Sequence, residues 1–172
     1  MRLRSIGVLA FIAILSSCQK PEWIVVTPGD GASSISMPST PREEIQRVTT
    51  PAGDIDVRTF VFEQEDIAYS ITYTDFPEAL IATRDTEKML DSARDGAISS
   101  VQGTLSAETK ITLEEFPGRE LRIDMSDGKH TAISRIYLVK SRLYQLSIAM
   151  PKEDSSSDDI TKFFSSFKLL RK

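Results

Sequence analysis

The chain of 172 residues is long enough to bury the core of one domain and is short for two. Its composition, 40% hydrophobic and 27% charged, is that of an ordinary globular chain and disfavours disordered and collagen-like proteins. The 21 basic side chains are outnumbered by 25 acidic ones, so the basic excess that phosphate neutralisation needs is missing and no nucleic-acid partner is expected.

The first segment is basic and then apolar. Arg2 and Arg4 precede an uncharged run of apolar and glycine residues, 6–15. As a helix this run would span about 15 Å at 1.5 Å per residue, roughly half of a hydrocarbon core, which disfavours a transmembrane anchor. Residues 1–17 are therefore predicted to be a signal peptide for export.

Cys18, the only cysteine, follows this segment directly. Together with Leu15, Ser16 and Ser17 it resembles the lipobox of bacterial lipoprotein precursors. The resemblance implies a diacylglyceryl group on Cys18, cleavage before Cys18 and acylation of the freed amine, with fatty acids such as palmitate. A lipid bilayer would then hold the protein through two or three acyl chains, whereas one short chain binds only reversibly. The alternative is an ordinary signal in which Cys18 is a buried apolar residue.

The lipoprotein resemblance also implies a location, on the periplasmic side of a membrane of the cell envelope. Gln19 stands where an aspartate tends to retain lipoproteins at the inner membrane, so the outer membrane is expected if the organism has one. A lone cysteine in an exported chain forms no internal disulfide. Removal of residues 1–17 deletes two arginines and no acid, so attraction to an anionic membrane surface is not expected.

The mature chain is predicted to contain a lipidated cysteine with a short tether, residues 18–22, and one α+β domain, residues 23–172. Alternating β-branched and aromatic residues between turn signals predict strands. The predicted strands are residues 23–27, 33–37, 45–49, 55–64, 67–74, 108–116, 120–125, 132–140 and 143–150. Pro117-Gly118 and Ser141-Arg142 are two of the predicted turns, and Pro38 and Pro41 are expected to interrupt the strand ladder.

Two segments have helical rather than strand periodicity. Apolar residues recur every three or four positions over residues 89–101, with Asp85 or Thr86 as the start and Gly103 as a left-handed exit. Gly96 lies inside this helix and indicates a close approach to the sheet. A C-terminal helix is predicted from the apolar stripe of residues 160–167, after an acidic, serine-rich start.

These elements predict an α+β fold: a mainly antiparallel sheet of about seven to nine strands with two helices packed on it. The order of the elements, together with the sequence segments 116–120 (FPGRE) and 142–146 (RLYQL), resembles the PsbP and Mog1 type of fold over about residues 30–170. The resemblance implies a protein that binds partners or assists assembly without catalysis. It assigns a role to no residue of this chain.

Catalytic and metal-binding patterns are sparse. His130, the only histidine, follows Asp127-Gly128-Lys129 and is predicted to lie at an exposed hairpin tip. Carboxylate catalysis by Glu114, Glu115 and Glu120 is the enzymatic alternative, and solvated strand and turn charges are the other interpretation of these residues. Neither a metal nor a cofactor is expected, because no His or Cys cluster and no glycine-rich phosphate motif occurs.

A basic and aromatic group in the last predicted hairpin is the candidate interface. An Arg and Tyr patch is the composition of an interaction hot spot, although a sheet face packed against a helix uses the same residues. The members are Arg135, Tyr137, Lys140, Arg142 and Tyr144. The hypothesis from the sequence is a lipid-anchored, non-catalytic binding or assembly module for an envelope protein, or for a small ligand held between sheet and helix. An envelope hydrolase that uses carboxylates is the alternative.

Overall fold

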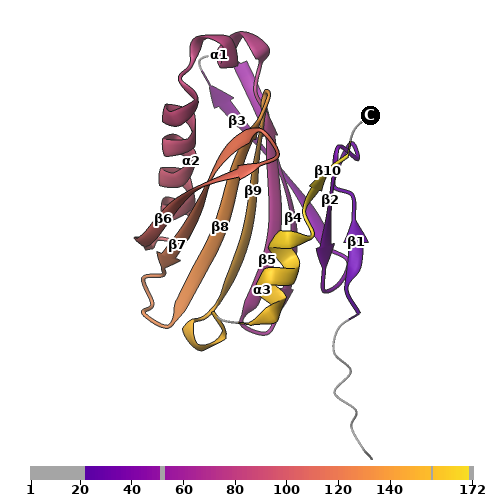
Figure 1. Cartoon of the computed structure of the whole chain (residues 1–172), viewed down its shortest axis with the longest axis vertical. Helices are drawn as coiled ribbons and strands as arrows, with labels where there is room; N and C mark the ends of the chain where they lie inside the picture. Colours follow the sequence, from indigo (N-terminus) through magenta and orange to yellow (C-terminus); the bar gives the residue numbers. More distant parts are fainter. Residues whose placement is uncertain (1–21, 51–52, 156, 171–172) are drawn as a thin grey trace, which may run out of the picture.

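The computed structural model describes residues 22–50, 53–155 and 157–170. Its largest element is an antiparallel sheet with the spatial order β3-β4-β5-β9-β8-β7-β6 (Figure 1). The strands are β3 (Arg42–Thr50), β4 (Gly53–Gln64), β5 (Ile67–Asp75), β6 (Thr104–Leu113), β7 (Phe116–Asp124), β8 (His130–Val139) and β9 (Arg142–Pro151). Each half of the sheet is a meander of hairpins, and β5 pairs with β9 where the two halves meet.

Three short strands form a second, smaller sheet. β1 (Ile24–Val26) and β10 (Lys168–Leu169) both pair antiparallel with β2 (Ser33–Met37), which lies between them. Ile35 and Met37 of β2 are fully buried in the core of the main sheet. A single sheet was predicted, and the early strands instead form this separate layer, because the prolines between β2 and β3 interrupt the ladder as expected.

The described part of the chain also forms three α-helices, α1 (Glu78–Thr83), α2 (Thr86–Ser100) and α3 (Asp158–Ser165), and a 3-10 turn, η1 (Lys152–Asp154). α2 begins as predicted, since the Asp85 carboxylate accepts a hydrogen bond from the backbone N–H of Lys88 at 3.0 Å. Ser157 caps α3 through the N–H of Asp159. α1 is a short helix between β5 and α2 that the sequence did not predict.

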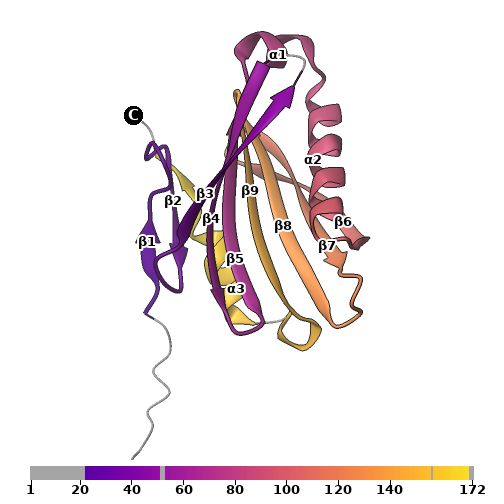
Figure 2. The ribbon, with the colours of Figure 1, turned by 180° about the vertical axis from the view of Figure 1, so that it is seen from behind.

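The helices cover opposite faces of the main sheet. α2 packs on β7 and β8, where Leu90 and Ala97 meet Leu121, Ile123 and Ile136. Figure 2 shows that β4, β5 and β9 carry no helix on this face. α3 and the small sheet cover the other face and enclose the larger core cluster. The cluster includes Tyr69, Ile71, Tyr73, Tyr137, Tyr144, Leu146, Ile148, Phe163, Phe164 and Phe167.

A buried arginine lies beneath α2. The Arg119 side chain on β7 is only 5% exposed, and its Nε donates to Glu108 Oε1 of β6 at 2.9 Å. Its guanidinium also pairs with Glu87 of α2. Glu87 in turn accepts from Lys110 Nζ at 2.9 Å, and Glu108 lies 3.4 Å from Arg94 Nη1 of α2. This charged network joins the helix to the edge of the sheet.

The turn between β6 and β7 is not where the sequence predicted it. Pro117-Gly118 was the predicted turn, whereas the chain reverses at Glu114 and Glu115, with Glu114 at φ +53°, and Pro117 and Gly118 belong to β7. A Cβ on Gly118 would lie 2.4 Å from the backbone oxygen of Ile136 on β8. The glycine is therefore needed for close approach of two strands and not for a turn.

Three smaller expectations also fail. The turn between β8 and β9 is Lys140-Ser141, and Arg142 already belongs to β9. Gln102 at φ +49° makes the left-handed exit of α2 in place of Gly103, whose position is a close contact with Ile123. A Cβ on Gly96 would meet no atom within 4 Å, so no close approach explains that glycine.

Candidate functional site

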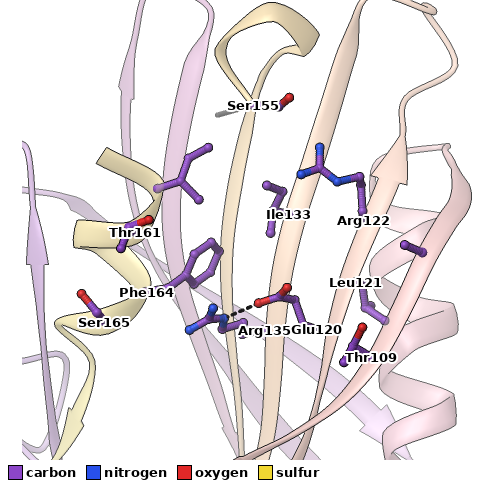
Figure 3. Close-up of a pocket in the computed structure, with 12 residues that line it drawn as sticks. Thr109, Glu120, Leu121, Arg122, Ile133, Arg135, Ser155, Thr161, Phe164 and Ser165 are labelled. Atoms are coloured by element: carbon purple, nitrogen blue, oxygen red, sulfur yellow. Dashed lines mark hydrogen bonds and ion pairs between the residues drawn. The ribbon is translucent and has the colours of Figure 1, made fainter. Parts of the chain in front are cut away.

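A groove of about 290 Å³ lies between α3 and the face of β6, β7 and β8 that α3 covers only in part (Figure 3). The strands supply one wall and the floor, and α3 with Ser155 supplies the other side. Its lining residues are Ala107, Thr109, Glu120, Leu121, Arg122, Ile133, Arg135, Ser155, Ile160, Thr161, Phe164 and Ser165. One hypothesis from the sequence was a small ligand held between sheet and helix, and this groove occupies such a position.

An ion pair crosses the floor of the groove. Arg135 Nε of β8 donates to Glu120 Oε2 of the neighbouring β7 at 2.6 Å, and the two residues are paired directly across the strands. The Arg135 guanidinium carbon also lies 4.8 Å from the centre of the Phe164 ring of α3. A charge-assisted bond and a cation–π contact therefore fix Arg135, and Glu120 neutralises its charge.

Arg122 is the second cation that lines the groove, and no residue in the described part of the chain neutralises it. Its side chain extends from β7 across β8, toward the side of the groove on which α3 lies (Figure 3). Its guanidinium forms neither a hydrogen bond nor an ion pair with any residue that the structure describes. Every other arginine in the described ranges, except the exposed Arg84, takes part in an ion pair. Arg122 is partly buried, so its charge is only partly hydrated.

The rest of the groove combines an apolar floor with hydroxyl groups on both walls. Ile133 of β8 and Phe164 of α3 are buried below the surface of the groove, and the partly buried Ile160 of α3 also lines it. Thr109 stands on the β6 wall and Thr161 on the α3 wall, both exposed. This arrangement can bind a small molecule with an anionic group and a partly apolar body.

Strand alternation explains how the sequence builds this site. Glu120 and Arg122 point to the α3 side of β7, whereas Leu121 and Ile123 between and after them point into the core under α2. Register brings Arg135 opposite Glu120, and Ile133 opposite Arg122. The sequence prediction named Arg135 and Glu120 for different reasons and missed Arg122. The polar positions of the alternation at residues 120–123 were the signal that could have found it.

The candidate interface residues do not form one exposed patch. Tyr137 and Tyr144 are 5% and 2% exposed and pack against Phe167 in the core, as the alternative of core packing described. Arg142 Nε and Nη2 bind the carboxylate of Asp75 at 2.6 and 2.7 Å, and the guanidinium also pairs with Asp30.

Lys140, the remaining member of that group, is an exposed residue of the β8–β9 turn. It lines a second, wider hollow with Arg142, Glu114 and Glu115. Of the predicted interface residues, Arg135 therefore lines the groove, Lys140, Arg142 and Tyr144 line the wider hollow, and Tyr137 lines neither.

The three glutamates of the hydrolase alternative are also divided. Glu114 and Glu115 are exposed in the β6–β7 turn and line the wider hollow. Glu120 lines the groove and is bound to Arg135. Because Glu120 is held by an arginine and lines a different hollow, the structure does not bring the three carboxylates together as one constellation.

His130 lies in the hairpin between β7 and β8. Its Nδ1 is 2.5 Å from Asp127 Oδ2, and its backbone N–H donates to Asp127 Oδ1 at 3.0 Å. The backbone N–H of His130, followed by its ring and the N–H of Lys129, lowers the pKa of Asp127 to about 2. These bonds close the Asp-Gly turn, and neither residue lines the groove.

The predicted lipid anchor cannot be compared with the structure. Cys18, with the signal peptide and lipobox, lies outside the described residues, and so does most of the predicted tether. None of the described helices is both long and apolar enough to span a membrane. Among the described residues, no three His, Cys, Asp or Glu side chains are grouped to hold a metal ion.

Comparisons with known proteins concern the fold. The chain matches no family model and no curated protein. It is similar to the solved structure of the cyanobacterial PsbP protein (CyanoP) from Synechocystis sp. PCC 6803, with a TM-score of 0.60 and 11% identity, over 96% of this chain and 99% of that chain. The solved structure of PA94, a Pseudomonas aeruginosa protein of unknown function, matches 81% of this chain and 90% of its own at 11% identity. Its TM-score is only 0.36, which is too low to indicate a shared fold. The chain therefore has a PsbP-like α+β fold, and the fold class predicted from its sequence is confirmed.

Proposed function

We propose that this protein is a lipid-anchored, non-catalytic binding module of the bacterial cell envelope, and that its ligand occupies the groove between α3 and the main sheet. The observation that carries the proposal is that Arg122, in that groove, has no partner in the described ranges 22–50, 53–155 and 157–170. A partly buried cation without a partner loses hydration and gains no compensating bond. An anionic ligand would supply that bond, so the groove is better suited to a bound molecule than to an empty state.

The fixed parts of the groove favour binding over chemistry. Glu120 and Arg135 neutralise each other, and Phe164 holds the Arg135 guanidinium in place. A general acid or base needs a proton-transferring group that is free to contact the reacting atom, whereas Glu120 Oε2 already accepts from Arg135 Nε at 2.6 Å. The groove therefore offers fixed recognition groups, which are the property of a binding site.

The proposed anchor is Cys18, and chain length sets how far the domain can lie from it. Trp23 is the fifth residue after Cys18, so a fully extended link spans at most about 18 Å. Trp23 is already part of the domain, with its ring edge-on to Tyr69 at 5.7 Å and Lys162 Nζ 4.5 Å from its centre. An acylated Cys18 would keep the whole domain close to the membrane surface, and Gln19 favours the outer membrane where one exists.

The anchor is tested by growth with an alkyne-tagged fatty acid and comparison of the wild type with Cys18→Ser. Labelling of the wild type alone, with recovery in the membrane fraction, supports a lipoprotein. Equal labelling of both proteins, or of neither, contradicts it.

Ligand binding is tested on the full chain in detergent with a library of small fragments. The expected result is that one or more fragments raise the melting temperature, and that Thr161→Trp, which fills the groove from the exposed α3 wall, removes the effect. If no fragment binds in the groove, or if a hydrolase screen finds activity that Glu120→Gln abolishes, the proposed function is wrong.

A further inference from the structure

We infer that the groove binds a small organic monocarboxylate, with Arg122 as the residue that recognises the carboxylate. This inference rests on the proposed function and specifies its ligand. The guanidinium group presents two parallel N–H donors, and a carboxylate presents two oxygens at matching separation. Because Arg122 has no partner among the described residues, both donors are available to a ligand.

The charge balance of the groove favours a single negative charge. Glu120 cancels Arg135 at 2.6 Å, so Arg122 is the cation that remains for a ligand. No helix start adds positive potential, because the first turn of α3 carries Asp158 and Asp159. A dianionic phosphate would be neutralised only in half by Arg122, whereas a monocarboxylate is balanced by Arg122 alone.

The surroundings of Arg122 define the body of the ligand. Ile133 lies directly across the strands from Arg122, and Ile160 and Phe164 of α3 extend this apolar floor. The hydroxyl groups of Thr109, on the β6 wall, and Thr161, on the α3 wall, form no hydrogen bond within the described residues. With a volume of about 290 Å³, the groove accommodates a compact apolar or aromatic body that carries one carboxylate and few other polar groups.

The probe for this inference is 4-phenylbutyrate, whose flexible spacer lets the carboxylate reach Arg122 while the ring lies on Ile133 and Ile160. Its binding to the full chain in non-ionic detergent is measured by isothermal titration calorimetry, with the heat of partition into empty micelles subtracted. The neutral 4-phenylbutan-1-ol and phenyl phosphate, a dianion at pH 8, are titrated in parallel. They separate the contribution of the charge from that of the apolar body, and one negative charge from two.

The variant is Arg122→Gln, and the matched control is Arg84→Gln. Arg84 is also an arginine without an ion pair among the described residues, but it lies between α1 and α2, at the other end of the molecule from α3 (Figure 1). Neither side chain bonds to another side chain that the structure describes. Both variants should therefore melt within about 2 °C of the wild type, because surface changes of this kind rarely alter stability.

The expected result is that Arg122→Gln weakens 4-phenylbutyrate binding about tenfold to a hundredfold, as loss of a hydrogen bond to a charged group does. Arg84→Gln should leave it unchanged within twofold, and the alcohol should bind the wild type as weakly as the acid binds Arg122→Gln. The inference is overturned if the acid does not bind, if Arg122→Gln binds it normally, or if phenyl phosphate binds more tightly than the acid. Fragments that still bind the groove in any of these cases would leave the proposed function standing.

Discussion

Replacement of Arg119 by methionine tests whether the charged network under α2 stabilises the fold. Methionine keeps most of the length of the side chain and removes the charge. The substitution breaks the bond from Arg119 Nε to Glu108 at 2.9 Å and the pairing with Glu87. A charged hydrogen bond contributes about 1.5 to 3 kcal/mol, and removal of one partner from a fully buried ion pair costs about 3 to 5 kcal/mol.

The structure places the cost below that upper range. Glu87 is 50% exposed and keeps Lys110, and Glu108 is 25% exposed and keeps Arg94 at 3.4 Å, so neither acid becomes an isolated buried charge. The methionine also returns some apolar burial beneath the helix. We therefore expect the free energy of unfolding to fall by about 1 to 3 kcal/mol, with a lower melting temperature of about 2 to 4 °C per kcal/mol for a chain of this size.

The assay is equilibrium unfolding in urea, followed by far-ultraviolet circular dichroism. The midpoint should fall with an unchanged m-value, since the change concerns stability and not the surface exposed. Arg47→Met is the control, because Arg47 makes one ion pair, with Asp56, on an exposed strand and should show no measurable change. An Arg119→Met protein as stable as the wild type, or more stable, would refute the reasoning, because desolvation of the guanidinium would then outweigh its bonds.

Three further predictions follow from single residues. Gly118→Ala should lower the free energy of unfolding by about 1 to 3 kcal/mol in urea, because its Cβ would lie 2.4 Å from the Ile136 oxygen, and wild-type stability would contradict this close approach. A carboxyl ¹³C titration should place the pKa of Asp127 near 2. The contribution of Asp127 to stability should then be complete above about pH 4 and be lost as the pH falls toward 2. An ordinary pKa near 4 would show that the bonds from His130 are absent. Burial, with smaller effects of nearby aspartates, raises the pKa of Tyr69 to about 12. Absorbance at 295 nm should therefore show that its phenol ionises about two pH units above a free tyrosine, and the stability of the protein should decline from about pH 10 upward. Ionisation near pH 10 would contradict the burial of Tyr69.

The sequence predicted those parts of the fold that depend on local pattern. Alternation identified the strands of both meanders, and the period of three to four identified α2 and α3. Its errors concern glycines whose role is set by distant neighbours. Gly118 looked like a turn residue, but the contact that requires glycine there comes from Ile136 on another strand. The β2–β10 pairing joins residues from opposite ends of the chain, and no local pattern indicates such a pair.

The site was predictable only in part for a related reason. Arg135 was named for its composition, together with Tyr137 and Tyr144, and the structure puts those tyrosines in the core because both faces of β8 are covered. Arg122 is distinguished by the absence of a partner among the described residues, and that property depends on which strand edges and helix surround it. Register and packing decide it, and neither can be read from residue types alone.

The small sheet also has a consequence for how the chain acquires its structure. β1 and β2 are synthesised before the main sheet and β10 is synthesised after it, so this layer cannot be completed until the residues of β10 have left the ribosome. Ile35 and Met37 are fully buried in the folded protein, but they cannot be buried in the nascent chain before the strands of the main sheet have formed. Deletion of β10 would remove one of the two strands that pair with β2, and would loosen β1 and β2 although they lie more than 130 residues earlier in the chain.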